Sequence, residues 1–91
     1  MIEIYSKGGC KYCTLAKEFL DQKGIEYAEH KLDPLGANYQ IERQKLIKRT
    51  HQTTFPWIFV GTHFLGGYTD LIRAHDTLLL EKLGVKLELD F

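Results

Sequence analysis

The 91-residue chain has two cysteines, too few for the disulfide scaffold of a small secreted domain. Its twelve basic and twelve acidic side chains cancel, so no overall field attracts nucleic acid or an anionic membrane. No apolar run approaches bilayer length, and no secretory leader precedes the first apolar run. Internal repeats and low-complexity tracts are also missing. We therefore expect one domain over residues 1–91, mature as it stands and acting through a local site.

The two cysteines stand three positions apart, in the segment Cys10-Lys11-Tyr12-Cys13. They follow an apolar run and open a helical pattern, so both thiols are expected on neighbouring parts of a helix N-terminus, close enough to form a disulfide. A bridge over so short a loop removes only about 2 kcal/mol of chain entropy. The pair is therefore expected to react rather than to stabilise, and a cytoplasmic, reducing compartment is the default.

Charge separates the roles of the two thiols. The positive end of the helix, with Lys7 and Lys11, favours a thiolate at Cys10, whose pKa we expect to fall. Cys10 is the candidate nucleophile. Cys13 lies one turn inside the helix beside the apolar positions Ala16 and Leu20, so it is expected to be more buried and to act as the resolving thiol.

Two other interpretations of the cysteines remain open. They could form half of a zinc site, but the four histidines are scattered singly, so no metal site is predicted. They could also be incidental core residues. The Gly8-Gly9 pair argues against that, because glycines before Cys10 allow a loop to expose both the sulfur and the helix start.

Apolar periodicity predicts an α/β domain with a four-stranded mixed sheet flanked by three helices. Strands are expected at residues 2–5, 25–32, 57–60 and 63–65, and helices at 11–23, 38–49 and from about 70 to Gly84. The first two strands should be parallel, and the last two antiparallel around Gly61-Thr62. Ile41, Leu46 and Ile47 are expected to anchor the second helix, and His75 to be a core or edge residue. Residues 84–91 form a C-terminal tail without an assigned structure.

Cys-x-x-Cys after the first strand of such a fold is typical of thioredoxin-like redox proteins. More narrowly, the chain resembles the glutaredoxins over nearly its whole length. The resemblance is carried by Lys7, Cys10-Lys11-Tyr12-Cys13, Thr54-Phe55-Pro56 and Gly66-Gly67-Tyr68-Thr69-Asp70. It implies a thioredoxin-like fold and a monomeric, glutathione-dependent thiol–disulfide oxidoreductase without a tightly bound cofactor.

The resemblance also implies where glutathione binds. A cis Pro56 and the backbone of Phe55, after Thr54, would meet the cysteinyl part of glutathione. Lys7 and Gln52 would meet its glycine carboxylate.

The γ-glutamyl end would lie at Gly67, Thr69 and Asp70, where the start of a helix offers free N–H groups to a carboxylate. Tyr12 would flank the groove. Each residue also has an ordinary interpretation: Lys7 and Gln52 as solvated groups, Thr69 or Asp70 as an N-cap, and the tyrosines as packing residues.

The chain departs from the family pattern at three positions. Lys11 replaces a common proline, and Phe55 and Trp57 are bulkier than usual. Alternative functions are an electron donor coupled to thioredoxin reductase, or a [2Fe-2S] carrier held through Cys10 and glutathione, for which Lys11 is a long and charged neighbour. Expected partners are glutathionylated or disulfide-bonded proteins, with ribonucleotide reductase as one candidate.

Overall fold

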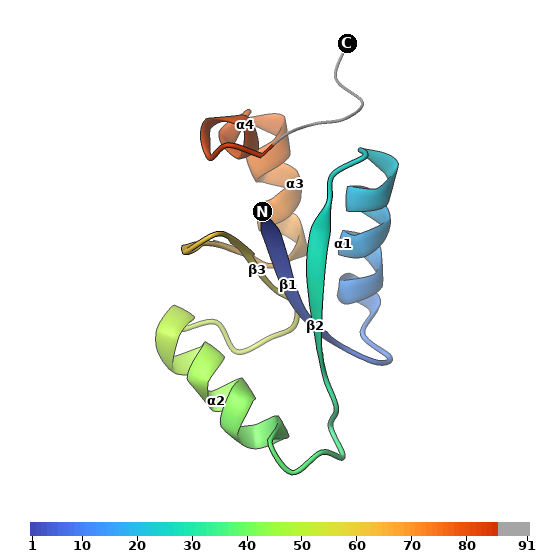
Figure 1. Cartoon of the computed structure of the whole chain (residues 1–91), viewed down its shortest axis with the longest axis vertical. Helices are drawn as coiled ribbons and strands as arrows, with labels where there is room; N and C mark the ends of the chain where they lie inside the picture. The colour runs from blue at the N-terminus through green and yellow to red at the C-terminus, as the bar shows by residue number, and fades with distance from the viewer. Residues whose placement is uncertain (86–91) are drawn as a thin grey trace.

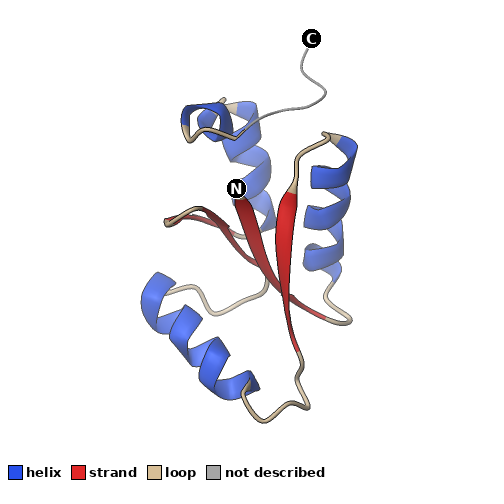
Figure 2. Ribbon diagram, in the orientation of Figure 1, coloured by secondary structure: helices blue, strands red, loops and turns tan. Residues whose placement is uncertain are grey.

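The structure is a computed structural model that describes residues 1–85. Its elements are β1 (Ile2–Lys7), α1 (Lys11–Gln22), β2 (Tyr27–Leu32), α2 (Tyr39–Thr50), β3 (Trp57–Val60), β4 (His63–Gly66), α3 (Tyr68–Asp76) and α4 (Leu79–Lys82). The central sheet has α1 and α3 on one side and α2 on the other (Figures 1 and 2). The predicted α/β class is confirmed.

The four strands lie in the order β2-β1-β3-β4. β1 pairs with β2 in parallel, while β3 runs antiparallel to both β1 and β4. The predicted parallel and antiparallel pairings are therefore confirmed. β1 extends two residues further than expected, to Lys7, and so carries the chain directly to the loop before Cys10.

The side chains of β1 alternate between the two faces of the sheet. Ile2, Ile4 and Ser6 are buried beneath α1 and α3. The larger of the two cores fills this side. It contains Ile2, Ile4, Ala16, Leu20, Ile25, Ile58, Val60, Leu71, Ala74 and Leu80. This core fixes α1, and with it the cysteines, against the sheet.

The α2 side has a smaller and more aromatic core, built from Leu46, Trp57 and Phe59. Leu46 is buried and Ile47 packs against this core, as expected. The expectation for Ile41 was wrong, because its side chain is 55% exposed. Leu46 and Ile47 lie at the end of α2 that leads back to β3, whereas Ile41 lies in its first turn.

The last helix was expected to continue to Gly84, but it breaks after Asp76 into α3 and α4. The Thr77 hydroxyl donates back to the carbonyl of Arg73, and Leu78 takes a left-handed φ of 63°. The break turns Leu80 into the large core, where it is 1% exposed. A continuous helical pattern of leucines therefore hid a change of direction that burial of Leu80 favours.

His75 is half-buried, with its ring edge-on to Phe19 at 5.2 Å between centroids, which confirms its core or edge position. Of the tail, residues 86–91 lie outside the described residues. Within residues 1–85, none of the helices combines the length and the apolar character needed to cross a bilayer.

Candidate active site

Cys10 and Cys13 lie at the N-terminus of α1 and are joined as a disulfide, with their Cα atoms 5.3 Å apart. Cys10 is the N-cap residue, and its sulfur accepts a hydrogen bond from the Cys13 N–H at 3.3 Å. Gly9, with a φ of 71°, supplies the left-handed turn that a larger residue would adopt at a cost before the helix begins. The sulfurs thus lie at the positive end of the helix.

The two cysteines differ in exposure, as the sequence predicted. Cys13 is 1% exposed and lies among the buried residues of α1, whereas Cys10 is partly exposed. An incoming thiolate or disulfide can therefore reach the sulfur of Cys10 more easily than that of Cys13. This difference agrees with an attacking Cys10 and a resolving Cys13.

Two lysines flank the disulfide. The Lys7 ammonium lies 5.2 Å from the ring centroid of Phe55, and the Lys11 ammonium lies 5.8 Å from that of Tyr12. Both are cation–π contacts with aromatic rings at the edge of the site. These contacts place both ammonium groups over aromatic rings that line the groove described below.

A groove of about 230 Å³ reaches Tyr12, which lies between the two cysteines in the sequence. It is lined by Tyr12, Gln52, Thr54, Phe55, Pro56, Gly67, Tyr68, Thr69 and Asp70. Three segments that are far apart in the sequence therefore meet: the start of α1, the loop before β3 and the start of α3. Lys7 stands beside this groove through its contact with Phe55.

The loop before β3 forms one wall of the groove. The peptide bond between Phe55 and Pro56 is cis, as the resemblance implied. The side-chain amide of Gln52 donates hydrogen bonds to the carbonyls of Thr54, at 2.7 Å, and of Pro56, at 2.8 Å. The wall is thus fixed by a side chain of the same loop, which itself lines the groove.

Phe55 does not block the groove. Its ring stacks on Tyr39 of α2, with 6.3 Å between centroids and 11° between planes, and meets the Trp57 ring edge-on at 4.7 Å. Trp57 is fully buried on the α2 side of the sheet. The two bulky residues therefore enlarge the aromatic packing beside the groove and leave it open.

The start of α3 forms the opposite wall. Asp70 accepts the N–H of Gly67 at 3.0 Å, so its carboxylate caps the first turn of the helix. Gly66 has a φ of 128°, and a Cβ there would collide with the Asp70 carboxylate. The glycine pair therefore allows this close approach, and the first N–H groups of α3 remain without partners inside the helix.

Sequence reasoning missed several residues around the site. Tyr68 was taken as a packing residue, but it lines the groove and lies 6.0 Å from the Tyr12 ring. Its position inside the Gly-Gly-x-x-Asp segment was the available signal. Tyr39, which stacks on Phe55, and Thr50, which bonds to the groove loop, gave no signal because both belong to the mostly polar α2.

A hydrogen-bonded cluster beneath α1 ties this helix to the sheet. Lys17 forms an ion pair with Glu29 of β2 at 2.9 Å, and buried Ser6 of β1 donates to the same carboxylate oxygen. The Ser6 hydrogen bond and Lys17 hold the pKa of Glu29 below its usual value. The cluster joins β1, β2 and α1 just behind the cysteine loop.

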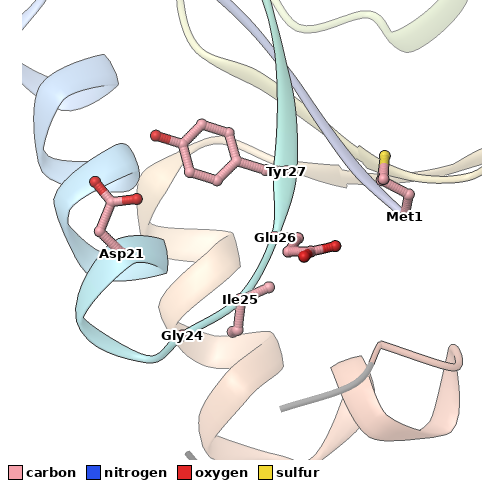
Figure 3. A pocket seen from close by; sticks show the side chains of 6 residues that line it. All are labelled: Met1, Asp21, Gly24, Ile25, Glu26 and Tyr27. Carbon is pink, nitrogen blue, oxygen red and sulfur yellow. The ribbon is translucent and has the colours of Figure 1, made fainter. Parts of the chain in front are cut away.

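A separate pocket of about 460 Å³ lies at the C-terminal end of α1. Figure 3 shows the Asp21 carboxylate and the Tyr27 hydroxyl there, pointing to the same side. Burial and the charge of Asp21 raise the pKa of Tyr27. This pocket contains none of the predicted site residues.

The side chains that could bind a metal ion are those of His, Cys, Asp and Glu. Within residues 1–85, no three His, Cys, Asp or Glu side chains are grouped closely enough to hold a metal ion. His30 is instead paired with Glu3 at 2.8 Å and stacked on Tyr5.

A family model described as Glutaredoxin matches residues 2–65. Glutaredoxin 3 of Escherichia coli K12 is 40% identical over 70 residues, which cover 77% of this chain and 80% of the relative. The solution structure of glutaredoxin from Brucella melitensis is 34% identical, with a TM-score of 0.71 and coverage of 90% of this chain and 85% of that one.

The crystal structure of a buckwheat glutaredoxin–glutathione complex has a TM-score of 0.81 at 27% identity, covering 90% of this chain and 74% of that one. The resemblance seen in the sequence and the thioredoxin-like fold are thereby confirmed. With the Cys10–Cys13 pair intact, this chain belongs to the glutaredoxin family and is a dithiol glutaredoxin, a glutathione-dependent disulfide reductase.

Proposed function

We propose that the chain reduces glutathione mixed disulfides and protein disulfides, with glutathione bound in the groove beside Cys10. The observation that carries the proposal is the groove itself. Eight of the predicted glutathione-binding residues line it: Tyr12, Gln52, Thr54, Phe55, Pro56, Gly67, Thr69 and Asp70. Glutathione is a co-substrate here, and the proposal includes no tightly bound cofactor.

The chemistry of the groove suits the three parts of the tripeptide. The backbone of Phe55 presents N–H and C=O groups to the cysteinyl residue. The free N–H groups at the start of α3 suit the γ-glutamyl carboxylate, and Asp70 suits its ammonium. At the other end, Lys7 lies against Phe55 and supplies a cation for the glycine carboxylate.

The reaction follows from the exposure of Cys10. Its thiolate attacks the glutathione sulfur of a mixed disulfide, a new Cys10–glutathione disulfide forms, and the target leaves as a thiolate that takes up a proton. A second glutathione thiolate then attacks the glutathione sulfur of this intermediate. Oxidised glutathione leaves, and the Cys10 thiolate is restored.

Protein disulfides need both cysteines. Cys10 attacks one sulfur of the target and forms a mixed disulfide with it, and the other target thiolate leaves. Cys13 then attacks the Cys10 sulfur, releases the second target thiol and forms the Cys10–Cys13 disulfide seen in this structure. Two glutathione molecules return the pair to the dithiol.

A coupled assay tests the proposal. A glutathione mixed disulfide is supplied with glutathione, glutathione reductase and NADPH, and we expect steady NADPH oxidation that depends on the chain. Turnover that requires thioredoxin reductase instead would identify the chain as the alternative electron donor. A brown colour with charge-transfer absorption after anaerobic reconstitution would support the [2Fe-2S] alternative.

The proposal extends to the setting of the protein. We propose that the protein is a monomer. We also propose a reducing, cytoplasmic compartment, which the closely spaced cysteine pair supports. Its protein substrates would be glutathionylated or disulfide-bonded proteins, with ribonucleotide reductase as one candidate. Size-exclusion chromatography of the reduced chain tests the monomer.

A further inference from the structure

Gln52 has no donor left for a substrate. Its side chain is half-buried and lines the groove, and its amide nitrogen donates to the carbonyls of Thr54 and Pro56 at 2.7 and 2.8 Å. Because both neighbours are carbonyl oxygens, the nitrogen rather than the oxygen of the amide must face them. An amide nitrogen carries two hydrogens, so both are used within the loop.

The two carbonyls that Gln52 holds lie on either side of Phe55. Phe55 is the residue whose backbone is proposed to pair with the cysteinyl part of glutathione. The Thr54 carbonyl shares a peptide plane with the Phe55 N–H, so this hydrogen bond sets the direction of that N–H. The Pro56 carbonyl belongs to the plane after the one that carries the Phe55 C=O, so the second bond holds the chain on the far side of Pro56. Gln52 therefore acts on the backbone that is proposed to face glutathione through hydrogen bonds within the loop.

The same loop is connected to α2 and β3 through the Thr50 hydroxyl. This oxygen donates to the Leu46 carbonyl at 2.7 Å and accepts from the Gln52 N–H at 3.2 Å and from the Trp57 indole at 3.0 Å. A hydroxyl has one donor and two acceptor positions, so its capacity is filled. The hydrogen bonds continue from the buried end of α2 to Gln52 and to the first residue of β3.

A glycine carboxylate in the groove would need N–H donors. The Gln52 side chain has only its carbonyl oxygen left, and an acceptor repels a carboxylate. We propose that Gln52 is a positioning residue, which holds the Phe55 backbone for pairing with glutathione without contacting the glycine carboxylate. This inference rests on the proposed binding of glutathione in the groove.

A substrate pair separates positioning from direct contact. One substrate is the mixed disulfide of glutathione with 2-mercaptoethanol, and the other is the same disulfide made with the glycyl ethyl ester of glutathione. The two differ at the glycine end, which is a carboxylate in the first and an uncharged ethyl ester in the second. The variants are Gln52→Ala, Lys7→Ala for a residue assigned to the carboxylate, and Gln44→Ala as a matched control on the exposed side of α2.

We expect Gln52→Ala to lower kcat/KM by about tenfold for both substrates, as loss of about 1.4 kcal/mol of hydrogen bonding would. Lys7→Ala should lose activity with the free carboxylate and little with the ester. Gln44→Ala should match the wild type. A Gln52→Ala defect that disappears with the ester would overturn the inference, and so would the absence of any defect.

A second measurement does not depend on catalysis. Backbone NMR relaxation of the free protein should show lower order parameters over residues 53–56 in Gln52→Ala than in the wild type or Gln44→Ala. An equally rigid loop would overturn the positioning role even if the enzyme is active. Failure of the wild type to use either disulfide would instead overturn the proposed function. The relaxation data would still show whether the Gln52 hydrogen bonds hold the loop.

Discussion

At both ends of α1, a charged side chain has the sign that the helix dipole disfavours, but the consequences at the two ends differ. The first turn carries Lys11 at the positive end of the helix, with Lys7 close by in the preceding strand. The last turn carries Asp21 at the negative end, in the pocket shown in Figure 3. Each side chain has the sign that weakens the helix.

The cysteines give the first arrangement a use. An uncompensated positive end, with two lysines near it in the sequence, would favour a thiolate at Cys10 and so support its proposed attack on a disulfide. At the other end of α1, Asp21 lies near Tyr27, and burial together with the Asp21 charge raises the pKa of Tyr27. Charge at the first end serves reactivity, whereas charge at the second end mainly affects stability.

Of the changes considered, replacing the cysteine sulfurs should have the largest effect on activity. Cys10→Ser should lower all thiol–disulfide activity by at least about a thousandfold, because a serine hydroxyl is not ionised at neutral pH. Cys13→Ser should keep most reduction of glutathione mixed disulfides and lose most reduction of protein disulfides. The glutathione-coupled assay and a protein-disulfide assay measure the two activities.

The two cysteine variants are compared under one condition. If Cys13→Ser loses mixed-disulfide activity as completely as Cys10→Ser, then the attacking and resolving roles assigned here are wrong. Circular dichroism of both variants in the reduced form checks that the fold is retained.

Reversing the charge at the reactive end should have opposite effects on reactivity and stability. Lys11→Glu should raise the pKa of the reduced Cys10 thiol, because it replaces a nearby cation by an anion, and slow its alkylation near neutral pH. It should also stabilise the reduced protein by about 0.3–1 kcal/mol, because glutamate suits a helix N-terminus. Alkylation rate against pH and urea unfolding measure the two effects.

Lys48→Glu, on the exposed side of α2, serves as the control for Lys11→Glu. It should change neither the alkylation profile nor the reactivity of Cys10. An alkylation profile of Lys11→Glu that coincides with the wild type would contradict the electrostatic account of the first turn.

The ion pair between Lys17, in the middle of α1, and Glu29 of β2 provides a comparison with the charges at the two ends of the helix. Glu29→Gln should lower the free energy of unfolding by about 0.5–1 kcal/mol at pH 7, because the ion pair with Lys17 is lost and the Ser6 hydrogen bond becomes neutral. The pKa of Glu29 is lowered in the folded state, so this stabilisation is present above its usual value of about 4.5 and disappears as the pH falls.

Urea unfolding at a series of pH values tests the Glu29 prediction. Glu18→Gln, at an exposed position of α1, is the matched control and should show little difference at any pH. A difference between wild type and Glu29→Gln that persists unchanged to pH 2 would show that the carboxylate charge is not its source.

The smallest effect is expected at the C-terminal end. Asp21→Asn should stabilise the protein by about 0.3 kcal/mol, since it removes negative charge from the last turn. It should lower the pKa of Tyr27 toward 10.0 without changing enzyme activity. NMR titration of the Tyr27 ring and urea unfolding measure this. A fall in mixed-disulfide turnover would contradict the claim that charge at the C-terminal end of α1 affects stability and not reactivity.

The sequence predicted the parts of this molecule that depend on local chemistry. Helix α1 ends where Gly24 follows it, and strand β3 coincides with an uninterrupted apolar run. The groove was predictable because its residues lie in short segments that resemble a family. Each segment can be recognised from its own few residues, and the resemblance to the family indicated that the segments come together in space.

What the sequence did not predict depends on contacts between distant segments. The break at Thr77 and Leu78 lies within a continuous leucine pattern, and only burial of Leu80 in the core explains it. Exposure of Ile41 and the use of both Gln52 hydrogens also depend on what packs nearby. Periodicity gives the type of an element, whereas its partners come from the three-dimensional fold.

Trp57 is the single tryptophan of the chain, buried beside the groove loop with its indole N–H bonded to Thr50. Its ring is also in contact with Phe55. The protein therefore carries one intrinsic fluorophore that touches the residue proposed to hold glutathione. Emission excited at the indole band reports on that single place, so filling of the groove can be followed by fluorescence without an added label.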